Sequence, residues 1–194
     1  MEKQNIMSIL KNLNSNQKIK LEDIPDLDLY MDQVIQLFEN NLSGTKRNDD
    51  DKVLTKTMIN NYAKAKLLMS IKNKKYTKEH LILMSLIYEL KGGLSINDIK
   101  HLLTNIVSKY ENNDEYDLRK LYELFLEINN YDCEEFRKSV ENKVDVLKEK
   151  FKDNSVDEDY DEKFLLISSI ISMRNMYRRM GEALIDEYFL GSDK

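Results

Sequence analysis

Side chains suited to binding a polyanion are concentrated between residues 52 and 80. Eight lysines and one glutamate put this segment at +7, whereas the whole chain carries −5 and the remainder therefore −12. A cationic segment on an acidic chain is the electrostatic pattern expected of a local nucleic-acid site. The lysines stand at positions 52, 56, 64, 66, 72, 74, 75 and 78.

The first part of this segment predicts a recognition helix over residues 55–65, with Thr55 as its N-cap. The spacing of Leu54, Met58, Ile59 and Tyr62 predicts a buried stripe. Asparagine can pair with adenine through two hydrogen bonds, and threonine can contact a base or the thymine methyl group. A polar, solvent-facing surface is the alternative interpretation. The candidate DNA-facing residues are Lys56, Thr57, Asn60, Asn61 and Lys64.

The second part, residues 70–76, predicts a basic wing. Lys72, Lys74 and Lys75 are suited to phosphate contacts, which supply affinity without sequence information. A basic surface loop is the alternative. Thr77 is the predicted N-cap of the next helix.

Other residue types that could do chemistry lack a supporting pattern. His80 and His101 are predicted to be surface or boundary residues, and Cys133 a residue at a helix start. The sequence has no P-loop, dinucleotide fingerprint or zinc spacing. The aspartates at 49–51 and 153–161 lack the glycine and glutamate of a calcium loop. We therefore expect no enzyme activity, no catalytic residue, no metal and no cofactor.

Composition favours a helical, cytoplasmic protein. One proline and five glycines in 194 residues leave long helices uninterrupted, and 41% hydrophobic with 34% charged residues is typical of a globular chain. A single cysteine favours a reducing compartment. The longest apolar cluster, about ten residues, is half of what a membrane-spanning helix needs. No long apolar run follows the N-terminal residues 1–5, so we expect no secretory signal. We also expect no membrane partner.

Periodicity predicts an all-α fold in three parts. Residues 1–23 are a flexible or docking arm, 24–109 a winged helix-turn-helix domain, and 110–194 a helical dimerisation or effector domain ending in one long helix. For the first twenty residues, a short amphipathic helix and a frayed arm are equally favoured alternatives. Further helices are predicted at 29–42 with Asp28 as N-cap, 78–90, 95–107 with a Ser95–Asp98 capping box, 116–130, 132–151 with Asp132 as N-cap, and 162–189.

Residues 55–103 resemble the DNA-binding half of MerR-type regulators. The carrying features are the capped helix ending in Tyr62, the basic wing closing on Tyr76, and Leu94-Ser95-Ile96-Asn97-Asp98-Ile99-Lys100-His101-Leu102-Leu103, which is similar to that family's GFSLEEIKELL segment. Three features depart from the MerR pattern: Asn60 replaces the usual arginine, no GYR precedes Tyr76, and the turn before the recognition helix is about a dozen residues.

More broadly, residues 24–103 resemble the bacterial family known as domain of unknown function 1836, through segments 24–33, 54–62 and 74–80. The MerR resemblance implies that Thr57, Asn60 and Asn61 face double-stranded DNA, with Lys72 and Lys74 on phosphates. We therefore expect a DNA-binding transcriptional regulator, with repression as the favoured mode, that forms a homodimer through its C-terminal helices. The alternative is a helical protein–protein adaptor that binds no DNA. A small effector could occupy a cavity beside Met173, Met176 and Met180, although packed core is the simpler interpretation.

Overall fold

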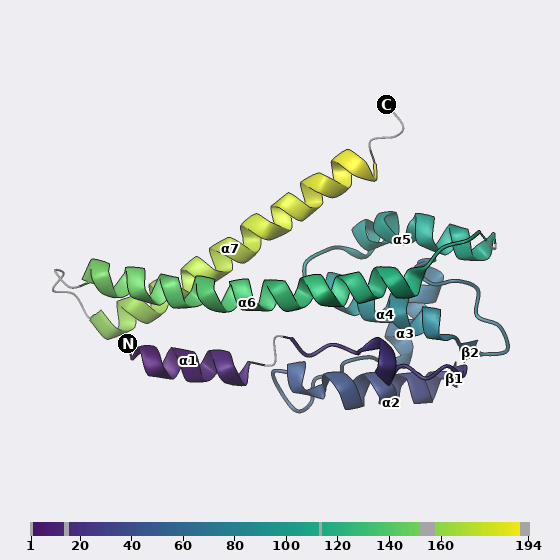
Figure 1. The fold of residues 1–194 in the computed structure, drawn as a ribbon, viewed down its shortest axis with the longest axis horizontal. Coiled ribbons are helices and arrows are strands. Elements are labelled where there is room, and N and C mark those ends of the chain that lie inside the picture. Colours follow the sequence, from purple (N-terminus) through teal and green to yellow (C-terminus); the bar gives the residue numbers. More distant parts are fainter. Residues whose placement is uncertain (1, 14–15, 113, 152–157, 191–194) are drawn as a thin grey trace. The chain divides into compact units, whose positions relative to one another are not determined.

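The computed structural model describes residues 2–13, 16–112, 114–151 and 158–190, and these are almost entirely helical (Figure 1). The only strands among these residues are two antiparallel strands of two residues each. The predicted all-α fold class is therefore confirmed. The elements are α1 (Lys3–Asn12), η1 (Leu21–Asp23), β1 (Leu29–Tyr30), α2 (Met31–Leu42), η2 (Ser43–Thr45), α3 (Lys56–Lys64), β2 (Lys75–Tyr76), α4 (Lys78–Leu90), α5 (Ile96–Glu111), α6 (Leu118–Phe151) and α7 (Glu158–Tyr188).

The chain forms two compact units. Unit 1 consists of Met1–Asn16 with Ile128–Gly181, and unit 2 of Gln17–Glu127 with Glu182–Lys194. The candidate DNA-facing residues all belong to unit 2. The domain division proposed at residue 110 falls inside unit 2, because α5 and the first part of α6 belong to it.

Helix α4 is the centre of unit 2. Its residues 80–87 are all buried, including Ile82, Leu83 and Met84 with no exposed surface. A helix that is apolar on every side must be surrounded by other elements. Phe38 from α2 and Ile59 from α3 are equally buried in the same cluster. The two helices that precede the wing are therefore held by one hydrophobic core.

Helix starts follow the predicted capping residues at Thr55, Thr77 and Ser95, but not at Asp28 or Asp132. Thr55 Oγ1 accepts from the Met58 N–H at 3.2 Å, and Ser95 Oγ accepts from the Asp98 N–H at 3.1 Å. The prediction that Asp28 caps the helix at 29–42 is wrong. Residues 29 and 30 form β1, so α2 starts at Met31 and the Gln33 side chain accepts from the Tyr30 N–H at 2.9 Å.

Two predicted helices are one. Helix α6 runs without interruption through 34 residues, so the break predicted at Asp132 is wrong. The segment from 118 to 151 contains neither glycine nor proline, and polar residues alone do not stop a helix that is packed along one side. Helix α7 starts at Glu158, four residues earlier than predicted, and thus includes Asp159 and Asp161. Residues 153–157 of the predicted acidic loop lie outside the described residues.

The start of α6 is tied to unit 2 by Tyr122. This side chain is 1% exposed, and its hydroxyl donates to the Ile19 carbonyl at 2.6 Å. Burial raises the pKa of Tyr122 to about 12. The phenol therefore stays protonated and keeps donating throughout the physiological range.

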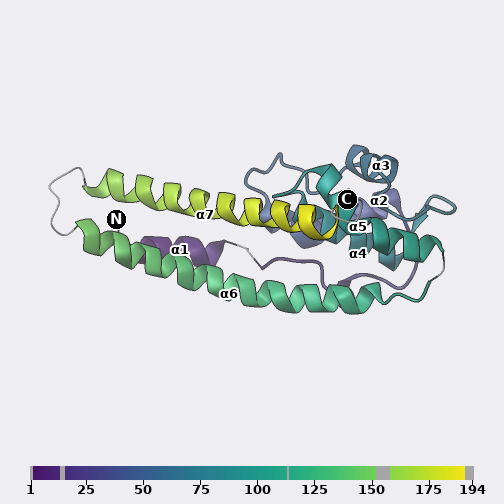
Figure 2. The same ribbon diagram turned by 90° about the horizontal axis from the view of Figure 1, so that it is seen from above.

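Unit 1 consists of α1 and segments of α6 and α7. Within this unit, α6 and α7 run in opposite directions (Figure 2). Lys143 Nζ on α6 donates to Ser169 Oγ on α7 at 3.0 Å. The N-terminal residues form helix α1 rather than a frayed arm, with Leu10 buried and Lys3 paired to Asp145 at 2.7 Å. In the described part of the chain, no helix has the length and apolarity needed to cross a bilayer.

Candidate nucleic-acid interface

The exposed side of α3 consists of the predicted DNA-facing residues. The buried residues Ile59 and Tyr62 face the core, with Met58 half-buried beside them. The opposite side is solvent-exposed at every position. It carries Lys56, Thr57, Asn60, Asn61 and Lys64. The helix thus presents two amides, one hydroxyl and two ammonium groups on one continuous surface, which we call the α3 face.

The predicted wing is a tight β-hairpin. Lys72 and Lys75 form a β-bridge, and the Lys75 N–H donates to the Lys72 carbonyl at 3.0 Å across a two-residue loop. The loop residues Asn73 and Lys74 have φ of 52° and 58°. Positive φ at both central positions is the signature of a type I′ turn, whose twist matches that of the flanking strands. The hairpin therefore projects Lys74 at its tip.

Left-handed backbone is confined, among the described residues, to this basic region. The three positions with positive φ are Lys66, Asn73 and Lys74, and glycine occupies none of them. Lys66 follows α3 at the position where helices usually end in glycine, and the Leu67 N–H closes the turn on the Tyr62 carbonyl at 3.0 Å. A lysine in this conformation costs about 1 kcal/mol or more relative to glycine. Both lysines therefore stand where the backbone favours glycine, which has no Cβ atom.

The start of α2 joins the α3 face to the hairpin. β1 pairs with β2 so that Leu29 faces Tyr76 and Tyr30 faces Lys75. Lys75 Nζ also lies 5.4 Å from the centre of the Tyr30 ring. Two residues later, Asp32 pairs with Lys56 at 2.9 Å. The first residue of α3 and the second strand of the hairpin therefore both contact a three-residue stretch, so the two basic segments are neighbours.

The lysines of this segment are not equivalent. Lys78 pairs with Asp26 at 2.9 Å and its side chain is only 11% exposed, while Lys56 pairs with Asp32 and Lys75 is half-buried against Tyr30. Five of the eight lysines in this segment are exposed and have no described carboxylate within 4.0 Å. They are Lys52, Lys64, Lys66, Lys72 and Lys74. The cationic surface is therefore smaller than the sequence count suggests, and it is centred on the end of α3 and the tip of the hairpin.

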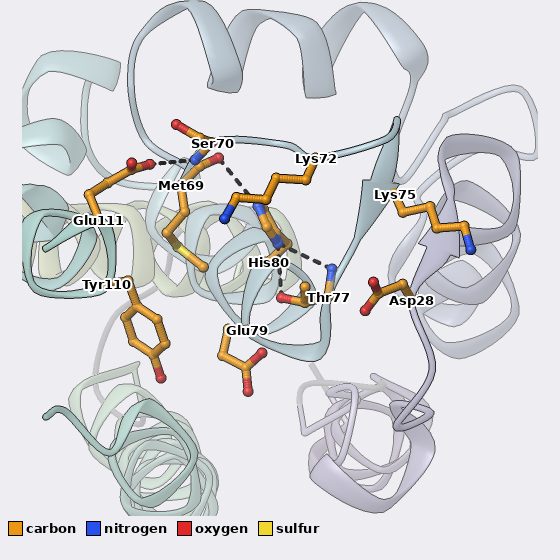
Figure 3. A pocket seen from close by; sticks show the side chains of 10 residues that line it. All are labelled: Asp28, Met69, Ser70, Lys72, Lys75, Thr77, Glu79, His80, Tyr110 and Glu111. Atoms are coloured by element: carbon orange, nitrogen blue, oxygen red, sulfur yellow. Dashed lines mark hydrogen bonds between the residues drawn. The ribbon is translucent and has the colours of Figure 1, made fainter. Parts of the chain in front are cut away.

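His80 holds the two ends of the hairpin segment (Figure 3). Its Nδ1 accepts from the Thr77 N–H at 3.1 Å, and its Nε2 lies 3.3 Å from the Met69 carbonyl. An imidazole that accepts at Nδ1 and donates at Nε2 is neutral. The side chain is 4% exposed, so the prediction of a surface or boundary histidine is wrong. The Thr77-x-x-His80 spacing is that of a capping box, and it could have indicated this role.

Glu111 holds the same segment from α5. Its carboxylate accepts from the Ser70 N–H, and hydrogen bonding by the Ser70 side chain and backbone keeps the pKa of Glu111 below its usual value. No local pattern in the sequence indicates this contact, because 41 residues separate the two partners. The hairpin is thus anchored by one side chain from α4 and one from α5, and its orientation depends on the core that positions these helices.

Lys72 and Lys75 of the hairpin line a pocket of about 340 Å³, where the Lys72 side chain extends towards His80 and the Lys75 side chain away from it (Figure 3). Its lining also includes Asp28, Glu79 and Glu111, so it carries both positive and negative groups. Among the described residues, no three His, Cys, Asp or Glu side chains are grouped closely enough to hold a metal ion.

We expect protonation of His80 to weaken the attachment of the hairpin. Burial lowers the pKa of His80, and the Met69 carbonyl and the carboxylates of Glu79, Asp28 and Glu111 oppose this shift only partly. The unfolded chain therefore takes up this proton at a higher pH than the folded chain does. Stability is lost as the pH falls below about 6.5 towards the folded-state pKa, and it is fully present above 6.5.

The measurement is hydrogen exchange of amides 69–77 at pH 7.5 and 5.5, corrected for intrinsic rates. The wild-type protein should lose protection at pH 5.5, and His80→Gln should show a smaller change between the two values. His101→Gln, the matched control on α5, should behave like the wild type. An equal loss of protection in His80→Gln would contradict the assignment.

A second pocket, of about 780 Å³, lies between α6 and α7 in unit 1. Phe136, Val140, Ile170 and Met173 provide its apolar surface. Met176 and Met180 are not part of this lining and are more than half exposed, so the packed-core interpretation does not hold for them. An effector in this pocket stays a prediction.

Comparison with known proteins places the chain in one family. No curated protein and no solved structure matches it. Residues 19–125, more than half of the chain, match the model of the family described as Domain of unknown function (DUF1836). This range contains both the α3 face and the hairpin, together with the helices that anchor them. The chain therefore belongs to the DUF1836 family.

Proposed function

We propose that the protein is a DNA-binding transcriptional regulator of the cytoplasm that acts as a homodimer, with repression as the favoured mode. The α3 face enters the major groove, where Asn60, Asn61 and Thr57 reach base edges. Lys64, Lys72 and Lys74 contact phosphates and set the orientation of the module. No enzyme activity or cofactor is part of this proposal.

The observation that carries the proposal is the lysine at each of two left-handed positions, Lys66 and Lys74. Glycine would be more stable at both, so the retained side chains point to a function outside the fold. Both side chains are exposed, Lys66 directly after α3 and Lys74 at the tip of the hairpin. A phosphate backbone running past these corners would provide the interaction that offsets the strain.

The order of elements also supports a winged helix-turn-helix similar to that of MerR-type regulators. A short strand leads into α2, α3 follows, and a hairpin pairs back onto the strand before α4 begins. A winged module of this kind places the second helix in the major groove and the hairpin on the flanking backbone. The shared contact of Lys56 and Lys75 with residues 30–32 supports simultaneous docking of both parts.

The experiment is a gel shift of the full chain on DNA from upstream of its own gene. We expect binding that weakens steeply with salt, because each neutralised phosphate contributes about 0.9 to the slope of log K against log salt concentration. Three lysines in each copy would make six phosphate contacts per dimer and give a slope of about −5. Absence of any shift at about 50 mM salt would contradict the proposal.

The alternative, a helical adaptor that binds no DNA, is favoured by one observation. Large apolar side chains on α7 are exposed, among them Ile167 at 63% and Tyr177 at 72%. Such side chains are typical of protein contacts. The adaptor predicts that the chain captures a different protein while failing to bind DNA at low salt.

A further inference from the structure

The pocket of about 340 Å³ beside the hairpin, which we call the hairpin pocket, has charged groups of both signs that do not pair with each other. Lys72 and Asp28 both line it, and both side chains are exposed. Among the described residues, the Lys72 ammonium has no carboxylate within 4.0 Å, and the Asp28 carboxylate forms no hydrogen bond or ion pair. Opposite charges that border one cavity without meeting leave a space that a ligand carrying both charges can fill.

The other two carboxylates of the lining already have partners. Glu79 accepts from Nε and Nη2 of Arg119, at 3.0 and 2.8 Å. Glu111 accepts from the Ser70 N–H and thereby anchors the hairpin segment. Asp28 is therefore the carboxylate that is left to bind a ligand.

The charges around the hairpin pocket balance. Its lining holds three carboxylates and two ammonium groups, and Arg119 adds one positive charge through its pair with Glu79 at 2.8 Å. His80, also in the lining, is neutral because its Nδ1 accepts a hydrogen bond. A ligand with a net charge would therefore gain no overall attraction, whereas a zwitterion can place each of its charges beside the opposite one.

Two further side chains of the lining, Tyr110 and Met69, provide apolar surface. Figure 3 shows Tyr110 and Asp28 on opposite sides of His80, with Lys72 extending towards His80 between them. The Tyr110 hydroxyl donates to the Tyr116 carbonyl at 3.2 Å, so the ring is held in place. The volume of about 340 Å³ equals that of about eleven water molecules, which is the size of one amino acid.

We propose that the hairpin pocket binds a free α-amino acid with an apolar or aromatic side chain. The carboxylate of the ligand pairs with Lys72 and its ammonium group with Asp28, while its side chain packs on Tyr110 and Met69. An apolar wall with a few polar groups that fix the orientation is typical of small-molecule sites. This inference goes beyond the proposed function and does not depend on DNA binding.

The first test is isothermal titration calorimetry of the full chain with valine, leucine, methionine and phenylalanine. At least one of them should bind with a dissociation constant of about 1 mM or lower. Aspartate and lysine, which carry a third charge, should bind at least about tenfold more weakly. Absence of binding by all four apolar amino acids at about 10 mM, or equally tight binding of aspartate or lysine, would overturn the proposal.

The second test removes one charge of the ligand at a time. The amide of the best-binding amino acid lacks the negative charge, and its N-acetyl form lacks the positive charge. Each should bind roughly tenfold or more weakly than the parent, because one of the two pairs is lost. If the amide or the N-acetyl form binds as tightly as the parent, or inorganic phosphate binds more tightly, the site does not recognise a zwitterion and the proposal is overturned.

The third test assigns each charge of the ligand to its residue. Asp28→Asn and Lys72→Met should each weaken binding of the parent roughly tenfold, whereas the matched controls Asp50→Asn and Lys52→Met, at exposed positions outside the lining, should not. In Lys72→Met the amide should bind as well as the parent, and in Asp28→Asn the N-acetyl form should do so, because the charge that is missing has no partner left. A variant that merely misfolds cannot reproduce this pattern. If each derivative is penalised equally in both variants, the assignment is overturned.

DNA binding is scored separately on the same proteins. A chain that binds the amino acid but never shifts DNA would leave this inference in place and remove the proposed function. A chain that shifts DNA but binds none of the four amino acids would do the reverse.

Discussion

The full chain with Lys64→Ala, Lys72→Ala and Lys74→Ala should bind DNA of every sequence roughly a hundredfold more weakly at 0.1 M salt. These lysines are exposed and have no carboxylate within 4.0 Å among the described residues. Their charges are thus available to phosphates, and each lost contact should reduce the steepness of the salt dependence by about one unit. Lys75 is left unchanged, because it packs on Tyr30 and its loss would disturb the hairpin.

The matched control removes the same charge elsewhere, through Lys11→Ala, Lys120→Ala and Lys138→Ala. These side chains are exposed on α1 and α6, and the pairs of Lys120 and Lys138 with glutamates three residues away are solvent-exposed and contribute little to stability. Binding isotherms from 50 to 200 mM salt distinguish the two variants. If both triple variants lose the same affinity, net charge alone is responsible and the hairpin has no special role.

Asn60→Ala should weaken binding to the preferred site by about 1–3 kcal/mol and relax preference at one base position. Asn60 lies in the middle of the α3 face, between Thr57 and Lys64, and its side chain is exposed. An amide in this place can satisfy both the N6 and N7 groups of adenine, and alanine satisfies neither. The salt dependence should stay unchanged, because no phosphate contact is lost.

Asn105→Ala is the matched control, since it makes the same substitution at an exposed position of α5. It should leave both affinity and preference unaltered. Titration on the preferred site and on a scrambled fragment of equal length gives the specificity ratio directly. Equal losses on the two fragments for Asn60→Ala would refute a role in reading bases.

Local patterns predicted the parts of this fold that depend on neighbouring residues. The cap at Thr55, the capping box from Ser95 to Asp98 and the exposed side of α3 all follow from residues within one or two turns of each other. Hydrophobic spacing also predicted the helix at 78–90, which is α4. The α3 face and the hairpin could therefore be assigned before their arrangement was known.

Features that depend on distant residues could not be predicted in this way. Residues 29 and 30 carry a helical pattern, yet they form a strand because Leu29 pairs with Tyr76 and Tyr30 with Lys75, 47 and 45 positions along the chain. The contacts of Glu111 with Ser70 and of Asp32 with Lys56 also join separate elements. The uninterrupted α6 shows the opposite case, in which packing overrides the local preference of Asp132 for a helix start.

The match to the DUF1836 family includes the whole candidate interface, because residues 19–125 contain every residue of the α3 face and the hairpin. The proposal made for this chain can therefore be examined in other members by the same substitutions. Positive φ at the two lysine positions is the feature to compare.

The most direct test of the central claim is selection of fragmented genomic DNA on the full, unmodified chain at about 100 mM salt, followed by sequencing of the bound fraction. We predict enrichment of fragments that share an inverted repeat, with half-sites about one helical turn of DNA or a multiple of it apart. The Lys64, Lys72 and Lys74 variant should recover far less DNA. A bound fraction indistinguishable from the input, at this salt and at 50 mM, would contradict the account.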